Sequence, residues 1–139
     1  VGRLDKDTEG LLLMTDDGTL THNLLSPRKH VDKDYEVHLA HEITDEELQK
    51  LEDGVDIGDE QKTLPARTCR DQMDAEGRNV IHLILHEGRF HQVKRMLEAV
   101  GNEVLFLKRI SMGNLVLDDT LQPGEYRELT EQELQDLRQ

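Results

Sequence analysis

The sequence predicts one α+β domain built on a mostly antiparallel, mixed sheet with a few flanking helices. Runs that are continuously apolar or that alternate, as strands do, outnumber the stretches with helical spacing. Turn sequences recur between these runs, which is the pattern that hairpins produce. The length of 139 residues fits a single domain, and no internal repeat or linker divides it.

The N-terminal part of the chain predicts a strand, a short helix and a second strand. Residues 11–15 form an apolar run before the turn sequence Asp16-Asp17-Gly18, and they predict a buried strand. Residues 19–25 carry apolar side chains at helical spacing, and Ser26-Pro27 ends the helix that they predict. Residues 33–39 alternate between apolar and polar side chains and predict a half-buried strand.

The middle of the chain predicts a helix followed by a hairpin. The sequence Thr44-Asp-Glu-Glu47 is a capping box, and it opens a helix that Gly54 ends. Residues 67–70 and 80–85 predict two strands joined by a turn at residues 74–77. The near-continuous apolar character of the second strand favours a central place in the sheet.

The C-terminal part predicts two helices and two strands. Residues 90–100 have the spacing of an amphipathic helix, which Gly101 closes at its C-terminus. Residues 104–110 and 115–117 predict further strands. A second capping box, Thr130-Glu-Gln-Glu133, opens the last helix.

Composition excludes several classes of protein. No run approaches the roughly 18 apolar residues of a membrane helix, and no signal-peptide pattern begins the chain. Cys69 is the only cysteine, which rules out an internal disulfide framework and a cysteine-rich zinc site and suits the reducing cytoplasm. The net charge of −13 ordinarily argues against a nucleic-acid partner. Residues 86–109 nevertheless carry five Lys or Arg against three acidic residues, so the sign of the charge varies along the chain.

Two stretches carry candidate chemistry. In Gly2-Arg3-Leu4-Asp5, Arg3 would keep Asp5 ionised and so favour it as a nucleophile or general base, although a loop salt bridge explains the pair more simply. In residues 88–95, a helix begins directly after a central strand, and helix N-termini bind anions. This second stretch adds the donor side chains Arg89, His91, Gln92, Lys94 and Arg95. A phosphate or nucleic-acid site and a helix with exposed basic residues explain it equally well.

Tyr35 and three histidines raise two further questions. Tyr35 lies on the inner face of the strand at residues 33–39, where it could pack with its hydroxyl bonded or line a pocket and stack on a base. His82, His86 and His91 suggest a metal site. Strand residues four apart lie roughly 13 Å from each other, which is too far to share one ion. We therefore expect no zinc site.

Four segments, taken in order, closely resemble the RsuA-type branch of the bacterial ribosomal RNA pseudouridine synthases. They read GRLDKDTEGLLLMTDDG, KDYEV, EGRFHQVKRMLEAVGNEV and LKRISMGNLVLDDTLQPGEYRELT, and together they cover nearly the whole chain. The resemblance implies a pseudouridine synthase-like catalytic core and an isomerase that converts uridine to pseudouridine in ribosomal RNA. It also implies that no cofactor or metal takes part. We expect a cytoplasmic monomer.

The resemblance also implies roles for individual residues. Asp5 matches the nucleophilic aspartate, Tyr35 the tyrosine that stacks on the flipped uracil, and Lys94 the basic residue that pairs with the carboxylate. An ionised Asp in a partly dry pocket is costly unless a cation lies close, which agrees with a role for Lys94. The expected substrate-binding residues are Arg3, Lys33, Arg89, His91, Gln92, Arg95 and Ile110.

The family's usual architecture shapes the expected domain organisation. Its members have a strand before the GRLD motif, and usually a small RNA-binding domain of the S4 type. Residues 1–139 are therefore expected to be a catalytic domain truncated at its N-terminus, without the S4-type domain. The segment KRISMGNLVLDDTLQPGEYR favours 16S ribosomal RNA of the small subunit as substrate, and a sibling enzyme acting on 23S ribosomal RNA is the alternative.

Two readings without catalysis also remain open. A non-catalytic RNA-binding module could retain the fold, but it would not need Asp5, Tyr35 and Lys94 together. An acidic protein–protein module would leave the basic segment at residues 88–95 unexplained.

Overall fold

The structure, a computed structural model, describes residues 8–15, 31–89, 91–113 and 115–138. Its strands are β1 (Glu9–Gly10), β2 (Lys33–Leu39), β3 (Arg67–Arg70), β4 (Asn79–Leu85), β5 (Val104–Met112) and β6 (Leu115–Val116), and its helices are α2 (Asp45–Asp53), α3 (Gln92–Ala99) and α4 (Glu131–Arg138). Within these residues, one six-stranded sheet runs in the order β1-β5-β2-β4-β3, and β6 pairs with β5.

The sheet is mixed and mostly antiparallel, which confirms the predicted α+β class. β2 pairs with β4 and with β5, β3 pairs with β4, and β6 pairs with β5, all in antiparallel fashion. Among the described strands, β1 alone runs parallel to its neighbour, β5. β4 has neighbours on both sides, as its apolar sequence predicts.

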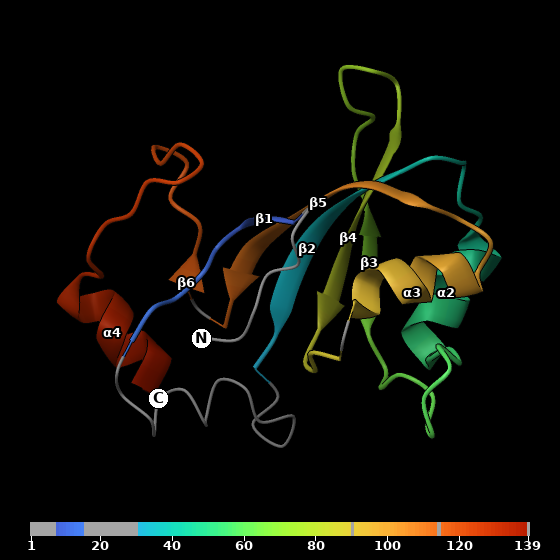
Figure 1. Ribbon diagram of the computed structural model, residues 1–139, viewed down its shortest axis with the longest axis horizontal. Helices are drawn as coiled ribbons and strands as arrows, with labels where there is room; N and C mark the ends of the chain where they lie inside the picture. Colours follow the sequence, from blue (N-terminus) through green and yellow to red (C-terminus); the bar gives the residue numbers. More distant parts are fainter. Residues whose placement is uncertain (1–7, 16–30, 90, 114, 139) are drawn as a thin grey trace.

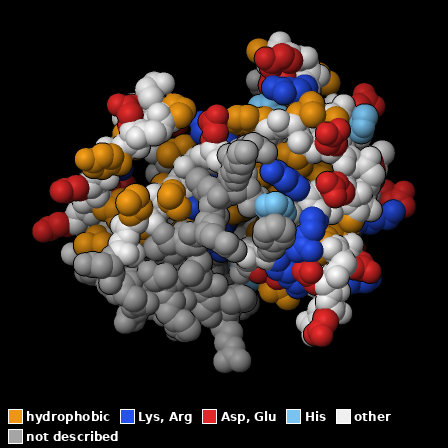
Figure 2. All heavy atoms as spheres, in the orientation of Figure 1, with side chains coloured by type: hydrophobic (Ala, Val, Ile, Leu, Met, Phe, Trp, Pro, Cys, Tyr) orange, Lys and Arg blue, Asp and Glu red, His pale blue; other side chains and the backbone are white. Residues whose placement is uncertain are grey.

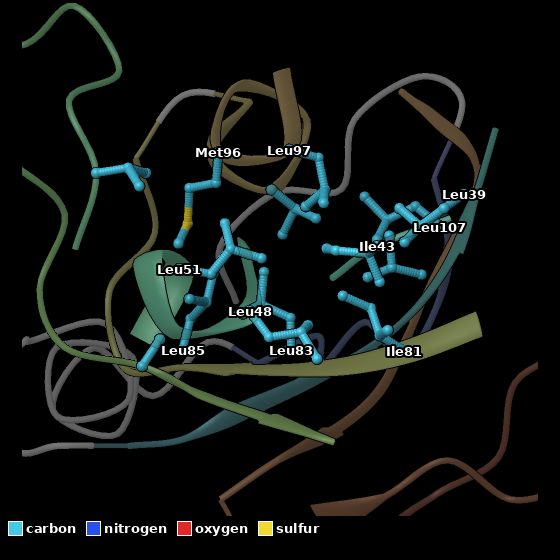
Figure 3. Packing of buried hydrophobic residues seen from close by; sticks show 14 of the residues in the cluster. Leu39, Ile43, Leu48, Leu51, Ile81, Leu83, Leu85, Met96, Leu97 and Leu107 are labelled. Atoms are coloured by element: carbon cyan, nitrogen blue, oxygen red, sulfur yellow. The ribbon is translucent and has the colours of Figure 1, made fainter. Parts of the chain in front are cut away.

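Helices α2 and α3 lie together against one face of the sheet (Figure 1). Between them and the strands, a main core buries apolar side chains that point toward one another (Figure 3). Its fully buried members include Val37, Leu51, Leu83, Met96 and Leu97. The predicted capping box is present at the start of α2, where the Thr44 hydroxyl accepts the N–H of Glu47 at 3.1 Å. The cap fixes where α2 begins, and one apolar stripe of the helix then faces the sheet.

A smaller apolar cluster lies beside α4, on the opposite side of Figure 1 from α2 and α3. It contains Leu13, Met112, Leu115 and Leu137. Leu13 thus packs in one cluster with Met112 at the end of β5 and Leu137 of the last helix. Within the described ranges, no helix has the length and apolar character that crossing a bilayer requires.

Two predicted elements differ from the structure. Residues 11–15 are not a strand, because the ladder with β5 ends at Gly10. Beyond it, Leu13 is buried while Met14 is 82% exposed, so this run contributes one apolar anchor instead of a strand. Helix α3 begins at Gln92, because His91 takes a left-handed conformation with φ 48° and ψ 38° directly before it. The helix predicted at residues 19–25 lies outside the described residues.

Candidate active site

The predicted site residues divide between two parts of the chain. Arg3 and Asp5 lie outside the described residues. Lys33 and Tyr35 come from β2, and Ile110 comes from β5. The others come from the turn before α3 and from the first turns of that helix: Arg89, His91, Gln92, Lys94 and Arg95.

Strand β2 places Lys33 and Tyr35 on the sheet face that carries the helices. Tyr35 is partly buried and packs against the main core, as the alternation predicts. Lys33 is only 4% exposed. Burial, and after it the positive charge of Arg109, lowers the pKa of Lys33, while Glu87 acts in the opposite direction. The inner face of β2 therefore begins with a buried cation next to the tyrosine.

Glu87 is the buried centre of the turn that precedes α3. Its Oε1 accepts hydrogen bonds from the Leu64 N–H and from Gln92 Nε2, each at 2.8 Å. Its Oε2 accepts one from Arg89 Nε at 3.1 Å. Gln92 closes the turn, since its Oε1 accepts the N–H of Arg89 at 2.9 Å. Gln92 and Glu87 thus hold the turn in a fixed shape, a role that spacing alone does not reveal.

The arginines of the turn and helix hold the neighbouring loop. Arg89 donates to the carbonyl oxygens of Gln61 and Lys62 at 2.7 and 2.9 Å. Arg95 donates to Asp59 Oδ1 at 3.0 Å, and its hydrogen bond is the main reason that the pKa of Asp59 is lowered. Both guanidinium groups are therefore bonded within the protein, and Asp59 offsets part of their charge.

Lys94 lies in the first turn of α3. It lines a cavity of about 370 Å³ together with Glu98 and residues 103–107. These residues include the first half of β5, whereas Tyr35 pairs with Arg109 in the second half. Ile110 falls where the register between β2 and β5 shifts, at a β-bulge beside Arg109. The structure thus places Tyr35 and Lys94 along different parts of β5.

Arg109 is a buried neighbour of Tyr35 that the sequence analysis did not single out. It is 2% exposed and lies opposite Tyr35 on one side and Gly10 on the other. A signal for it exists in the sequence, because Arg109 is in phase with the apolar Leu107 and therefore falls on the inner face.

The opposite face of the sheet carries a network of histidines and carboxylates. His82 Nδ1 lies 2.9 Å from Asp34 Oδ1, and His82 Nε2 lies 3.0 Å from Asp71 Oδ2. Among the described residues, one group has the donors and spacing for a metal ion: Glu36, Asp71 and His82, with ligand atoms within 4.8 Å of one another. It contains one of the three histidines considered from the sequence.

This network makes stability depend on pH. Burial acts to lower the pKa of His82, but the hydrogen bonds to Asp34 and Asp71 outweigh it, so that the pKa is raised. The protonated ring therefore stabilises the fold below the pKa of the unfolded chain, and this contribution disappears as the pH rises through the folded pKa. We expect His82→Gln to destabilise the protein by about 1 kcal/mol or less, more at about pH 5.5 than at about pH 9. Urea unfolding of both proteins at the two pH values measures this, and an equal or larger difference at the higher pH contradicts it.

The surface charge is not uniform. In the view of Figure 2, Lys and Arg side chains gather in the middle and lower right of the face, with Asp and Glu side chains among them as well as toward the periphery. A net charge of −13 is therefore compatible with a local group of basic side chains on the surface. A polyanion can be bound by such a surface.

Comparison with protein-family models matches residues 1–99 to the family described as RNA pseudouridylate synthase. The chain belongs to the RNA pseudouridylate synthase family. The matched range includes Asp5, Tyr35 and Lys94. Membership in the RNA pseudouridylate synthase family confirms the resemblance found from the sequence motifs.

Individual relatives agree with this assignment to the pseudouridylate synthases. YtzG of Bacillus subtilis, an uncharacterised RNA pseudouridine synthase, is 59% identical over 133 residues. Ribosomal small subunit pseudouridine synthase A of Yersinia pestis is 48% identical over 134 residues. Each alignment covers 96% of this chain and 55% of the relative, so the chain spans about half the length of these proteins. A crystal structure of a pseudouridylate synthase matches 98% of this chain and 57% of its own, with a TM-score of 0.87 and 42% identity.

Proposed function

We propose that the protein is an RNA pseudouridine synthase that acts on ribosomal RNA, with 16S RNA of the small subunit as its substrate. One observation carries the proposal: the match to the synthase family covers the segments that contain Asp5, Tyr35 and Lys94. The relative from Yersinia pestis, which is named for the small ribosomal subunit, supports the choice of 16S RNA.

The reaction is an isomerisation in which no atom is gained or lost. The Asp5 carboxylate attacks ribose C1′ of the target nucleotide, so that a bond to Asp5 forms as the bond between uracil N1 and C1′ breaks. The uracil turns, and its C5 attacks C1′, which forms the new carbon–carbon bond and releases the Asp5 carboxylate. The proton on C5 leaves and N1 gains one, so the product contains the same atoms as uridine. This balance needs neither an oxidant nor a cofactor.

The described residues supply the surroundings of this chemistry. Tyr35 offers a partly buried aromatic face near the start of β2, on which a uracil flipped out of the RNA can stack. Lys94 supplies the cation for the Asp5 carboxylate. The turn held by Glu87 fixes where α3 begins, and hence where Lys94 lies. The proposed contacts to the RNA are Arg3, Lys33, Arg89, His91, Gln92, Arg95 and Ile110.

The proposal extends to the protein's setting in the cell. The enzyme would work in the cytoplasm as a monomer, with the ribosomal RNA or an assembling small subunit as its partner. An S4-type domain would supply part of the affinity for RNA. The alternatives to a 16S RNA synthase are a sibling synthase that acts on 23S RNA and a non-catalytic RNA-binding module.

Mapping of pseudouridine in cells tests the proposal. Ribosomal RNA from a strain lacking the gene is treated with carbodiimide, and reverse-transcriptase stops are compared with those of the parent strain. We expect the loss of a stop in 16S RNA and its return when the gene is restored. A stop lost from 23S RNA instead would favour the sibling activity, and an unchanged pattern would overturn the enzymatic function.

A further inference from the structure

Arg109 lies on β5, between the strand that carries Tyr35 and the segment that follows Asp5 in the sequence. β5 is bordered by β1 on one side and by β2 on the other. Arg109 is the register partner of Gly10 in β1 and of Tyr35 in β2. One buried residue of β5 thus joins both segments that the proposed reaction needs.

The contact with residues 9–11 uses the backbone and the side chain of Arg109. The Leu11 N–H donates to the Arg109 carbonyl oxygen at 2.8 Å, and Arg109 Nε donates to the Leu11 carbonyl oxygen at 2.7 Å. β1 itself has two residues, so its ladder is short. The guanidinium bond therefore adds a large part of what holds this segment to the sheet.

Gly10 lets the two backbones approach closely. Its φ is 116°, a conformation that residues with a side chain rarely adopt, and a Cβ at this position would overlap the backbone of Arg109. The fit leaves Gly10 little freedom to move away from β5. Segment 9–11 is thus held by a close steric fit as well as by hydrogen bonds.

An arginine is a costly choice for this place if it serves packing alone. Among the described residues, its buried Nη2 has no hydrogen-bond partner, and a second buried cation, Lys33, lies close enough for the Arg109 charge to lower the Lys33 pKa. An apolar side chain would avoid both penalties. The guanidinium therefore has a use that packing does not explain.

We propose that Arg109 is a positioning residue that fixes the segment carrying Asp5 against the strand carrying Tyr35. Asp5 precedes Glu9 by four positions, so holding residues 9–11 restricts where the nucleophile can lie. The role rests on the proposed synthase activity. Arg109 acts through the backbone of residues 9–11, and the attack on the nucleotide remains the work of Asp5.

Arg109→Met tests this role, because methionine fills a similar volume without donating hydrogen bonds. Gly10→Ala disturbs the same contact from the other side and leaves the charge of Arg109 in place. Arg70→Met is the matched control, since Arg70 also donates to a backbone carbonyl, that of Ile43 at 2.8 Å, at another place in the sheet. All are compared with the wild type in single-turnover reactions at saturating ribosomal RNA, using the full-length protein.

We expect Arg109→Met and Gly10→Ala to lower the single-turnover rate by about 10- to 100-fold, as misplacement of a reacting group does. The dissociation constant for RNA should change by less than about twofold, because the variants impair the reaction within the bound complex and leave the formation of that complex intact. Arg109→Lys should recover part of the rate, and Arg70→Met should keep all of it. Hydrogen exchange at the Leu11 amide should become faster in both test variants, while exchange in β4 stays unchanged.

Other outcomes would overturn the proposal. An unchanged rate at saturating RNA together with faster Leu11 exchange would mean that Arg109 holds residues 9–11 without any effect on catalysis. Weaker RNA binding with an unchanged saturated rate would make Arg109 a substrate-binding residue. If the wild type forms no pseudouridine, the proposed function and the catalytic part of this role both fail. The Leu11 exchange would still decide whether Arg109 holds residues 9–11.

Discussion

Replacing Asp5 with asparagine is expected to abolish pseudouridine formation while RNA binding survives. Asparagine has nearly the same shape as aspartate, but its neutral amide is a much weaker nucleophile than a carboxylate. Removal of a nucleophile usually costs a factor of roughly a thousand or more. The measurement is a single-turnover assay of the full-length protein on ribosomal RNA, with RNA affinity determined separately.

Asp7→Asn is the matched control for this experiment. It removes the same charge two positions along the chain and should leave the rate within about threefold of the wild type, because Asp7 is assigned no part in the attack on the nucleotide. A large loss of rate in both variants would show that the reaction depends on the negative charge of this segment and not specifically on Asp5 as the nucleophile. An active Asp5→Asn variant would contradict the role of Asp5.

Leu83→Ala is expected to destabilise the protein more than any surface substitution. Leu83 has no exposed area and lies in the main core on β4, below helices α2 and α3 (Figure 3). Truncating a buried leucine removes apolar contacts and leaves a cavity, which usually costs about 2–5 kcal/mol. Urea unfolding followed by circular dichroism measures the loss as a lower midpoint.

Leu105→Ala provides the comparison, because it makes the same chemical change on β5 at a side chain that is 47% exposed. We expect the free energy of unfolding to change by about 0.5 kcal/mol or less. If the two variants lose similar stability, the core does not lie where the structure places it.

The sequence predicts most of the fold because the local patterns are strong. Alternation over residues 33–39 reproduces β2 to the residue, and the capping box at Thr44 locates the start of α2. The end of α3 is also predictable, since Gly101 follows the last turn with φ 81° and its N–H donates to the Glu98 carbonyl oxygen at 2.9 Å. These features depend on neighbours in sequence, which a sequence pattern records.

Features that depend on distant partners are predicted less well. Residues 11–15 look like a strand because they are apolar, but no ladder partner is available to them beyond Gly10. The buried charges Glu87 and Arg109 are also hard to foresee, since their use depends on Leu64, Gln92 and Leu11. The motifs identify the family without showing which polar side chains support the site.

The pairing of β1 with β5 has a consequence for the order of folding. Leu11 and Arg109 are separated by 98 positions, whereas β3 and β4 are joined by a short hairpin. Closing the longer loop costs more chain entropy, so contacts between near neighbours form sooner. Residues 9–11 leave the ribosome before every strand that they need, and they find their partner only after β5 has been made and placed. The pairing that borders Tyr35 on β5 is therefore completed late in folding, after β5 has joined the sheet.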